Sequence, residues 1–134
     1  MRVLLLGAIV ALASASACPS DIPEVVPNGN WGGQHMGMVV ADTGARIEYD
    51  CASGVINVTL RLSPDGAFDW AGIHYPGHGG PSRIDEPLNS HAARYTGHAT
   101  AEHMTITLTL LDGTQPPQTF TLDRGGNARV LKCL

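Results

Sequence analysis

Hydrophobic and polar residues alternate along most of the chain, which predicts β-strands with one buried face. The clearest run places Met104, Ile106, Leu108 and Leu110 in alternation with threonines. Turn-forming residues separate most of these runs, and no helix of normal length fits after the N-terminal segment. Strands are expected at 32–40, 45–51, 55–62, 67–75, 91–99, 104–110, around 120–122 and at 129–133.

Eight short strands in simple order predict an all-β fold, a small eight-stranded antiparallel up-and-down barrel that occupies residues 31–134 as one domain. Closure removes unpaired strand edges, and a β-sandwich is the alternative. Trp31 is interpreted as a plug at one end of the barrel, with Arg129 on the last strand as its partner. The side chains expected to fill the interior are Met36, Ile47, Leu60, Phe68, Trp70, Tyr95, Ile106, Leu108 and Phe120.

The N-terminus has the three parts of an export signal. Arg2 precedes an apolar run at 3–13, and Ala15 and Ala17 provide the small residues of a cleavage site. This run is too short to span a bilayer, which takes about 20 apolar residues. We therefore expect a signal peptide at 1–17, followed by a Pro-rich tether at 18–30. The protein is expected to be exported, whether periplasmic, envelope-anchored or extracellular.

Three cysteines follow the expected cleavage site. Cys18 is either the lipid-modified first residue of a bacterial lipoprotein or simply the residue after an ordinary cut, and Ala15 departs from the Leu that lipoprotein signals prefer. If Cys18 carries lipid, Cys51 and Cys133 are left as a pair. Oxidising surroundings outside the cell favour a disulfide between them.

The charge balance narrows the range of partners. The chain has 12 acidic against 8 basic side chains, and Lys132 is its one lysine. Affinity for nucleic acid comes from clustered Lys and Arg, so we expect no nucleic-acid partner. Contact with a membrane is expected only through a lipid anchor. The expected partner is a small ligand or a protein, bound by a monomer.

The connections of a meander alternate between the two ends of a barrel, and this predicts which residues meet. One end collects Cys51, Cys133, the loop at 76–90 and four histidines. His35, His78 and His91 are the candidate zinc or copper ligands, with His74 or Asp85 as a possible further ligand, because imidazole suits both metals. The competing interpretation has no cofactor and gives these histidines hydrogen bonds to backbone carbonyls.

Catalytic motifs are missing from the sequence. It contains no G-x-S-x-G, no H-E-x-x-H and no phosphate-binding loop. The expected function is therefore non-catalytic binding at the rim that carries His35 and the 76–90 loop. A metal-binding domain or metalloenzyme that uses the rim histidines is one alternative, and a structural envelope protein is another.

Two resemblances carry further expectations. The Gly29-Asn30-Trp31 segment, the eight strands and the late Arg129 resemble lipocalin-type (calycin) barrels, in which a tryptophan closes the barrel base and an arginine packs across it. The chain also resembles small exported bacterial proteins without an assigned function, which implies a compact disulfide-bonded β domain and no activity. The motifs behind this second resemblance are Trp31-Gly32-Gly33-x-His35, Asp50-Cys51-Ala52-x-Gly54-x-Ile56, His78-Gly79-Gly80-Pro81, Ala93-Arg94-Tyr95-Thr96-Gly97 and Leu131-Lys132-Cys133.

Overall fold

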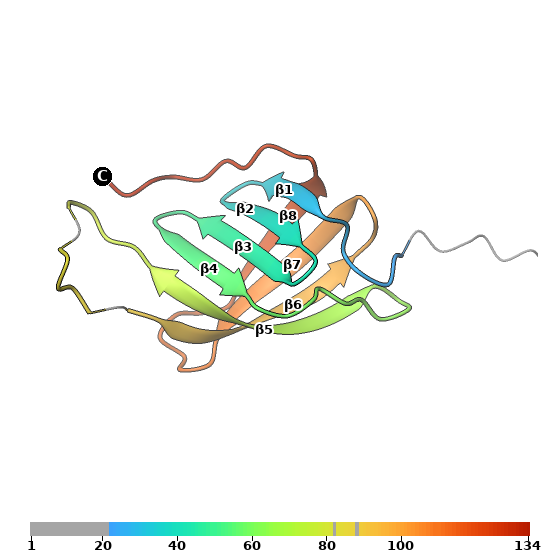
Figure 1. Ribbon diagram of the computed structural model, residues 1–134, viewed down its shortest axis with the longest axis horizontal. Coiled ribbons are helices and arrows are strands. Elements are labelled where there is room, and N and C mark those ends of the chain that lie inside the picture. Colours follow the sequence, from blue (N-terminus) through green and yellow to red (C-terminus); the bar gives the residue numbers. More distant parts are fainter. Residues whose placement is uncertain (1–21, 82, 88) are drawn as a thin grey trace, which may run out of the picture.

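The computed structural model describes residues 22–81, 83–87 and 89–134 and confirms the predicted barrel (Figure 1). Its strands are β1 (Gly29–Gly33), β2 (Met36–Ala41), β3 (Gly44–Tyr49), β4 (Ala52–Ile56), β5 (Ala67–Pro76), β6 (His91–Ala99), β7 (His103–Leu110) and β8 (Gln118–Arg124). Each strand pairs antiparallel with the next, and β8 pairs with β1 to close the barrel. Within the described residues, no helix is both long and apolar enough to cross a membrane.

The interior is packed with side chains that alternate along the strands, as the sequence predicts. In β7 every second residue, from Met104 to Leu110, is buried. Eight of the nine predicted interior side chains are buried, and the ninth, Phe120, is half-buried against the core. The barrel is therefore filled, because eight strands enclose only enough space for side chains.

The two ends of the barrel are distinguished here by the segments that cover them. The disulfide end carries the β1–β2 and β3–β4 turns, the 77–90 loop and the 111–117 loop. The lead-in end carries the other connections and the lead-in, residues 22–28. In Figure 1 the yellow 77–90 loop marks the disulfide end on the left, and the blue lead-in lies on the right.

The lead-in packs against the barrel, which corrects the prediction of a tether for the described part of 18–30. Val26 is fully buried and donates its backbone N–H to Leu60 O, at 2.9 Å. Residue Arg61 forms an isolated bridge with Val25. Residues 57–62, predicted to extend the third strand, leave the barrel wall, and residues 60–62 pair with the lead-in across the end of the barrel.

The predicted first strand, 32–40, is in fact a hairpin of β1 and β2. Gly33 pairs with Met36, so the turn holds only Gln34 and His35. His35 has a φ of 67°, a conformation that two-residue hairpin turns usually assign to Gly or Asn. The turn was missed because its residues carry no such signal. The hairpin adds one strand to the predicted number, and residues 129–133, predicted as the last strand, do not form one. The total is therefore still eight.

Residues 125–134 form a C-terminal strap that runs outside the barrel instead of a strand (Figure 1). Within it, Arg129 makes one isolated parallel bridge with Gln34. The strap lies close to β1 and β2, where a Cβ added at Gly32 would come within 2.3 Å of Gly126 O and one at Gly37 within 2.6 Å of the Ala128 Cβ. Glycine at both positions makes room for the strap.

Candidate functional site

Two tight turns support the C-terminal strap at the disulfide end. In the β3–β4 turn Tyr49 pairs with Ala52, so this turn also holds two residues, and Cys51 has a φ of 50°. His35 and Cys51 are the described non-glycine residues with positive φ. Each donates its backbone N–H to the strap, His35 to Arg129 O at 2.8 Å and Cys51 to Leu131 O at 2.9 Å. A positive φ costs free energy in residues other than glycine. These contacts help to hold His35 and Cys51 in that conformation.

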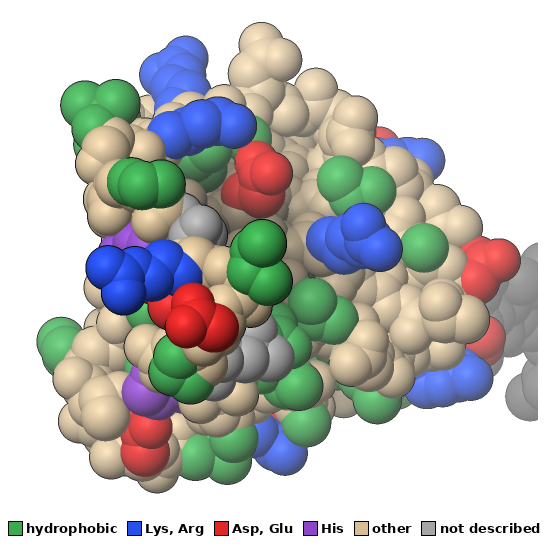
Figure 2. Space-filling view, turned by 60° about the vertical axis from the view of Figure 1, so that its left-hand side comes forward, with side chains coloured by type: hydrophobic (Ala, Val, Ile, Leu, Met, Phe, Trp, Pro, Cys, Tyr) green, Lys and Arg blue, Asp and Glu red, His purple; other side chains and the backbone are tan. Residues whose placement is uncertain are grey.

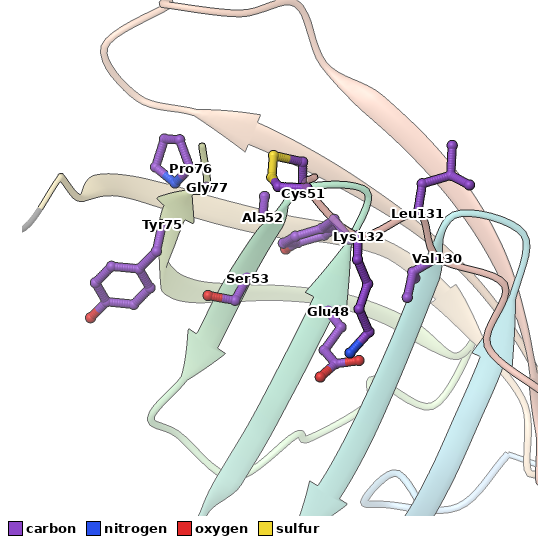
Figure 3. Close-up of a pocket in the computed structure, with 12 residues that line it drawn as sticks. Glu48, Cys51, Ala52, Ser53, Tyr75, Pro76, Gly77, Val130, Leu131 and Lys132 are labelled. Carbon is purple, nitrogen blue, oxygen red and sulfur yellow. A yellow bond between two sulfur atoms is a disulfide. The ribbon is translucent and has the colours of Figure 1, made fainter. Parts of the chain in front are cut away.

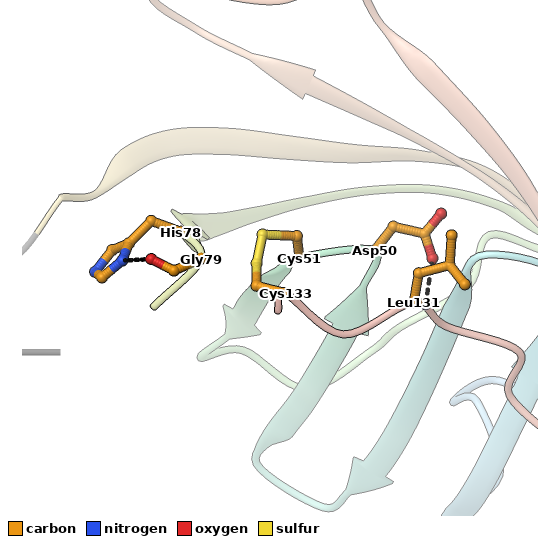
Figure 4. Close-up of a disulfide and its surroundings, with 6 residues drawn as sticks. All are labelled: Asp50, Cys51, His78, Gly79, Leu131 and Cys133. Carbon is orange, nitrogen blue, oxygen red and sulfur yellow. Dashed lines mark hydrogen bonds between the residues drawn. A yellow bond between two sulfur atoms is a disulfide. The ribbon is translucent and has the colours of Figure 1, made fainter. Parts of the chain in front are cut away.

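Asp50 joins the two turns to the strap. Its Oδ2 lies 2.5 Å from His35 Nδ1. Its Oδ1 accepts the Leu131 N–H at 2.7 Å (Figure 4). The pKa of Asp50 is lowered from its usual value, first by the Leu131 N–H and then by His35. A single carboxylate therefore holds three separate segments at this end.

Cys51 and Cys133, the predicted pair, lie at disulfide distance and are joined in Figure 4, with 4.8 Å between their Cα atoms. The backbone around the pair is also tied to the 77–90 loop, because Gly77 donates to Cys51 O and Gly80 to Leu134 O. A Cβ on Gly79 would come within 2.3 Å of Leu134 O. The end of the strap thus lies directly against this loop.

A groove of about 320 Å³ lies between the strap and the outer face of the barrel (Figure 3). Glu48, Ser53 and Tyr75 come from three neighbouring strands, β3, β4 and β5. Leu131 and Lys132 line it from the strap. Both an acidic and a basic side chain border this groove, along with an aromatic ring.

A larger cleft of about 470 Å³ opens between β8 and the β1–β2 turn. β7 pairs with β8 over residues 118–123, whereas β1 reaches only residues 122–124. The four β8 residues left without a β1 partner, 118–121, all line this cleft. Its other lining residues are Gln34, His35, Tyr49 and Asp50.

The backbone of β8 contributes polar groups to this cleft. Arg124 donates its N–H toward β7, to Glu102 O, and Gly125 donates toward β1, to Asn30 O. Along a strand, successive residues direct their N–H and C=O groups to opposite sides. Thr119 lies six residues before Gly125, so its N–H and C=O also point to the β1 side, where no described strand pairs with it. Phe120 and Tyr49, whose rings lie 5.8 Å apart, provide the apolar part of the lining.

The barrel interior below this cleft contains a pair of tyrosines. Tyr49 donates its hydroxyl proton to Tyr95 Oη at 2.6 Å, and both rings are buried. Burial raises the pKa of Tyr95 to about 12 and raises that of Tyr49 still further. A Cβ on Gly54 would come within 2.5 Å of the Tyr95 hydroxyl, and one on Gly72 within 2.5 Å of its ring. The two glycines make room for the pair.

His74 lies beside this pair and is 5% exposed, the buried polar side chain of the described core. Its ring centre is 5.3 Å from that of Tyr49 and 6.5 Å from that of His91, the residue directly opposite on β6. Burial lowers the pKa of His74, and the neighbouring His91 lowers it further. His91 Nδ1 in turn lies 2.5 Å from Asp112 Oδ2.

The predicted ligands His35, His78 and His91 do not form one cluster. His35 pairs with Asp50, His78 with Glu86 and His91 with Asp112, each in a different segment of this end. Asp85 lies exposed in the 77–90 loop. The described residues contain no group of three or more His, Cys, Asp or Glu that could hold a metal ion. The competing interpretation gave these histidines hydrogen bonds to backbone carbonyls, but each one pairs with a carboxylate. His78 also contacts a backbone carbonyl, because its Nδ1 lies near Gly79 O.

Trp31 and Arg129, the two members of the predicted barrel plug, lie in different surroundings. Trp31 is 1% exposed, and its indole donates to Pro27 O in the lead-in, so it lies toward the lead-in end and not beside His35. The Arg129 side chain is exposed. Its backbone N–H donates a hydrogen bond to Gly33 O, and its C=O accepts one from the His35 N–H. The predicted partnership with Trp31 depended on a last strand that the protein lacks. Cys18, the candidate lipidation site, lies outside the described residues.

Sequence reasoning missed Asp50, Tyr49, Phe120 and Asp112 as site residues. One signal was present for Asp50, which comes directly before Cys51 in a turn without glycine at its centre. Figure 2, which brings the disulfide end forward, shows acidic, basic and hydrophobic side chains interspersed there.

The chain matches no protein-family model, no curated protein and no solved structure. The closed eight-stranded antiparallel barrel is consistent with a lipocalin-like architecture at the level of the fold alone.

Proposed function

We propose that this protein is a non-catalytic binding module and that its ligand occupies the cleft between β8 and the β1–β2 turn. The observation that carries the proposal is the part of β8, residues 118–121, that has no β1 partner and lines a cleft of about 470 Å³. Ligand sites combine apolar walls with a few convergent polar groups. Here Tyr49 and Phe120 are the apolar part, and His35 and Asp50 are the polar part.

These residues favour a small ligand with a ring and at least one hydrogen-bond donor. The ring would pack on Phe120 and Tyr49, and the donor would reach the Asp50 carboxylate or the Thr119 carbonyl. The strap supports this arrangement by holding His35 and Asp50 from outside. A site held by surrounding hydrogen bonds binds more tightly, because less freedom is lost on binding.

NMR titration with a library of small ring-containing fragments tests the proposal. Amide shifts are expected to concentrate at residues 34, 35, 50 and 118–121. Phe120→Ala should weaken the binding of each such fragment about 10-fold, which corresponds to the ~1.4 kcal/mol of a lost apolar contact. Val39→Ala, on the outer face of β2, is the matched control and should change nothing. Fragments that bind only elsewhere, or binding unchanged by Phe120→Ala, would contradict the cleft.

We also propose that the protein is exported, which the Cys51–Cys133 pair supports because disulfides persist in oxidising compartments. Lipid attachment at Cys18 is part of the same proposal. The intact mass of the protein from membranes of the producing cell tests it. Lipidation predicts the mass of the chain from residue 18 plus acyl groups, and the mass of the unmodified chain would rule it out.

A further inference from the structure

The barrel wall has an open strand edge where β8 extends past β1. β1 pairs with residues 122–124 of β8, whereas β7 pairs with residues 118–123. After Gly33 the chain turns back into β2, so no described strand continues β1 alongside residues 118–121. A strand edge presents unpaired N–H and C=O groups that can bond another chain, and barrel closure usually removes it. Residues 118–121 keep such an edge.

Thr119 offers both of its backbone groups at this edge. It lies opposite Thr107 of β7, and the hydrogen bonds of this ladder are made by its neighbours of even number, as Arg124 shows by donating to Glu102. The N–H and C=O of Thr119 therefore point away from β7, on the side where the cleft lies. A residue placed opposite Thr119 in an added strand would exchange two hydrogen bonds with it.

The chain limits this edge at both ends. Pro116 and Pro117 come directly before β8, and proline has no N–H to donate to an added strand. At the other end, Leu122 already has Gly33 of β1 as its partner. An added strand can therefore follow β8 only along residues 118–121, which favours a short extended peptide over a long strand.

The rings in the cleft indicate which side chain such a peptide carries. Successive side chains of a strand point to opposite faces, so the residue next to the one opposite Thr119 points to the same face as Phe120. There it reaches the rings of Phe120 and Tyr49, whose centres lie 5.8 Å apart. Aromatic rings pack favourably with their centres about 4.5–7 Å apart. An aromatic side chain therefore suits this position.

Charge favours a basic residue beside the aromatic one. The described lining of the cleft has one carboxylate, Asp50, and no Lys or Arg. One oxygen of Asp50 accepts the Leu131 N–H and the other contacts His35 Nδ1, and a carboxylate has about four acceptor positions. The Asp50 side chain is 34% exposed, so a cation can reach it from solvent. The net charge of the chain, −4, has the same sign.

We propose that residues 118–121 bind an extended peptide segment of a second protein, which adds a short strand at the open edge and carries an aromatic residue beside a basic one. This inference rests on the proposed function, because it names the class of ligand for the same cleft. Hydrogen bonds to the Thr119 backbone hold the peptide, and Phe120, Tyr49 and Asp50 choose its side chains. Peptides that add a strand to a sheet edge are recognised in this way.

Thr119→Pro is the variant that separates backbone pairing from other binding. Proline lacks the N–H that an added strand needs, and its ring occupies the same side. The variant is expected to fold, because this N–H takes no part in the β7–β8 ladder and proline is tolerated on such an edge. Thr119→Ala is the matched control, since it removes the same side chain and its hydrogen bond to Thr107 but keeps the N–H.

NMR titration of the disulfide-bonded protein tests the inference. The probe is a library of short end-blocked peptides, randomised around a central phenylalanine with either lysine or glutamate beside it. Lysine peptides are expected to bind and to slow hydrogen exchange at the amide of residue 119. Thr119→Pro should weaken this binding by about 10-fold or more, because a hydrogen bond is lost and the ring blocks the edge. Thr119→Ala should change it by less than about 2-fold.

Three results would overturn the inference: a library without binders, equal binding by wild type and Thr119→Pro, or no preference for lysine over glutamate. Sedimentation that shows a dimer of this chain, abolished by Thr119→Pro, would also overturn it, because a second copy would then occupy the edge. Thr119→Pro keeps the Thr119 carbonyl and Asp50, so it should not change the binding of ring-containing fragments. Fragment binding without peptide binding would therefore remove the peptide and retain the cleft.

Discussion

The two ends of the barrel are closed by different kinds of interaction. At the lead-in end Val26 and Leu60 are completely buried, and the indoles of Trp31 and Trp70 donate to Pro27 O and Arg61 O. At the disulfide end the interior contains Tyr49, Tyr95 and His74 instead. The strap there is held by hydrogen bonds and by one covalent link.

This difference shows where the protein can accommodate polar groups. Burying a large apolar side chain contributes about 1.5–3 kcal/mol, whereas a typical hydrogen bond contributes only about 0.5–1.5 kcal/mol. At the disulfide end, a disulfide worth about 2–5 kcal/mol adds to the hydrogen bonds. The strap covers the turns from outside, and the cleft lies beside the part of β8 that β1 does not reach.

The largest effect is expected from removing the packed ring at the lead-in end. Trp31→Ala should lower the free energy of unfolding by about 3–5 kcal/mol, because it leaves a cavity in the core. Urea denaturation followed by far-ultraviolet circular dichroism measures it. Val39→Ala, at a side chain 53% exposed, should change it by less than about 0.5 kcal/mol. A small loss for Trp31→Ala would mean that this end does not depend on packing.

Removal of the disulfide should lower the free energy of unfolding and loosen the strap at the disulfide end. The double variant Cys51→Ser, Cys133→Ser opens a loop with a sequence separation of 82 and should lose about 2–5 kcal/mol. Hydrogen exchange should also become faster at the amides of residues 35 and 51, which donate to the strap. Amides in the centre of β6 and β7 serve as controls and should exchange only on global unfolding. Unchanged exchange at residue 35 would show that hydrogen bonds alone hold the strap.

The tyrosine pair should make the stability of the protein depend on alkaline pH. Burial raises the pKa of Tyr95 from 10.0 to about 12, so the unfolded chain loses its proton first. Stability that is fully present below pH 10 should therefore fall as the pH rises toward 12. Tyr95→Phe should reduce this slope and cost about 1–3 kcal/mol at neutral pH, because it leaves the buried Tyr49 hydroxyl without an acceptor. Urea denaturation at a series of pH values measures both.

Tyr75→Phe is the control for this slope, because Tyr75 is a partly exposed residue that lines the outer groove. It should leave the alkaline dependence unchanged. An equal slope in wild type and Tyr95→Phe would show that the pair does not cause it.

The smallest effect is expected at acid pH, from the carboxylate that joins the strap to the turns. The Leu131 N–H and His35 hold the pKa of Asp50 below its usual 3.8. A lowered pKa contributes stability that is present above pH 3.8 and is lost as the pH falls below it. Asp50→Asn should therefore make unfolding less dependent on pH in this range, whereas Asp85→Asn, at an exposed loop residue, should not. Thermal melts between pH 5 and pH 2 measure the difference.

The sequence predicted the barrel wall most accurately where alternation was strict. The expected strand at 91–99 matches β6 (His91–Ala99), and 104–110 lies within β7 (His103–Leu110). The β1–β2 hairpin was missed because His35 adopts a positive φ without being Gly or Asn. The strap was mistaken for a strand because 129–133 also alternates, although it bonds turns instead of a neighbouring strand.

The candidate site was predicted in location but not in detail. Alternating connections correctly assigned His35, Cys51 and the 77–90 loop to one end. They did not predict that His35 would meet Asp50 or that His91 would face His74. Such contacts depend on strand register, which a meander pattern does not specify.

By itself, the sequence determined the all-β class and most of the interior side chains, because a period of two is a local property. It offered Cys51 and Cys133 as a pair only if Cys18 carries lipid. Only the tertiary structure decided which carboxylate each histidine meets, how the strap covers the turns and why residues 118–121 of β8 have no β1 partner. The physical reason is that these features arise from residues far apart in the chain. Barrel closure places them within hydrogen-bond distance, and no local pattern encodes that placement.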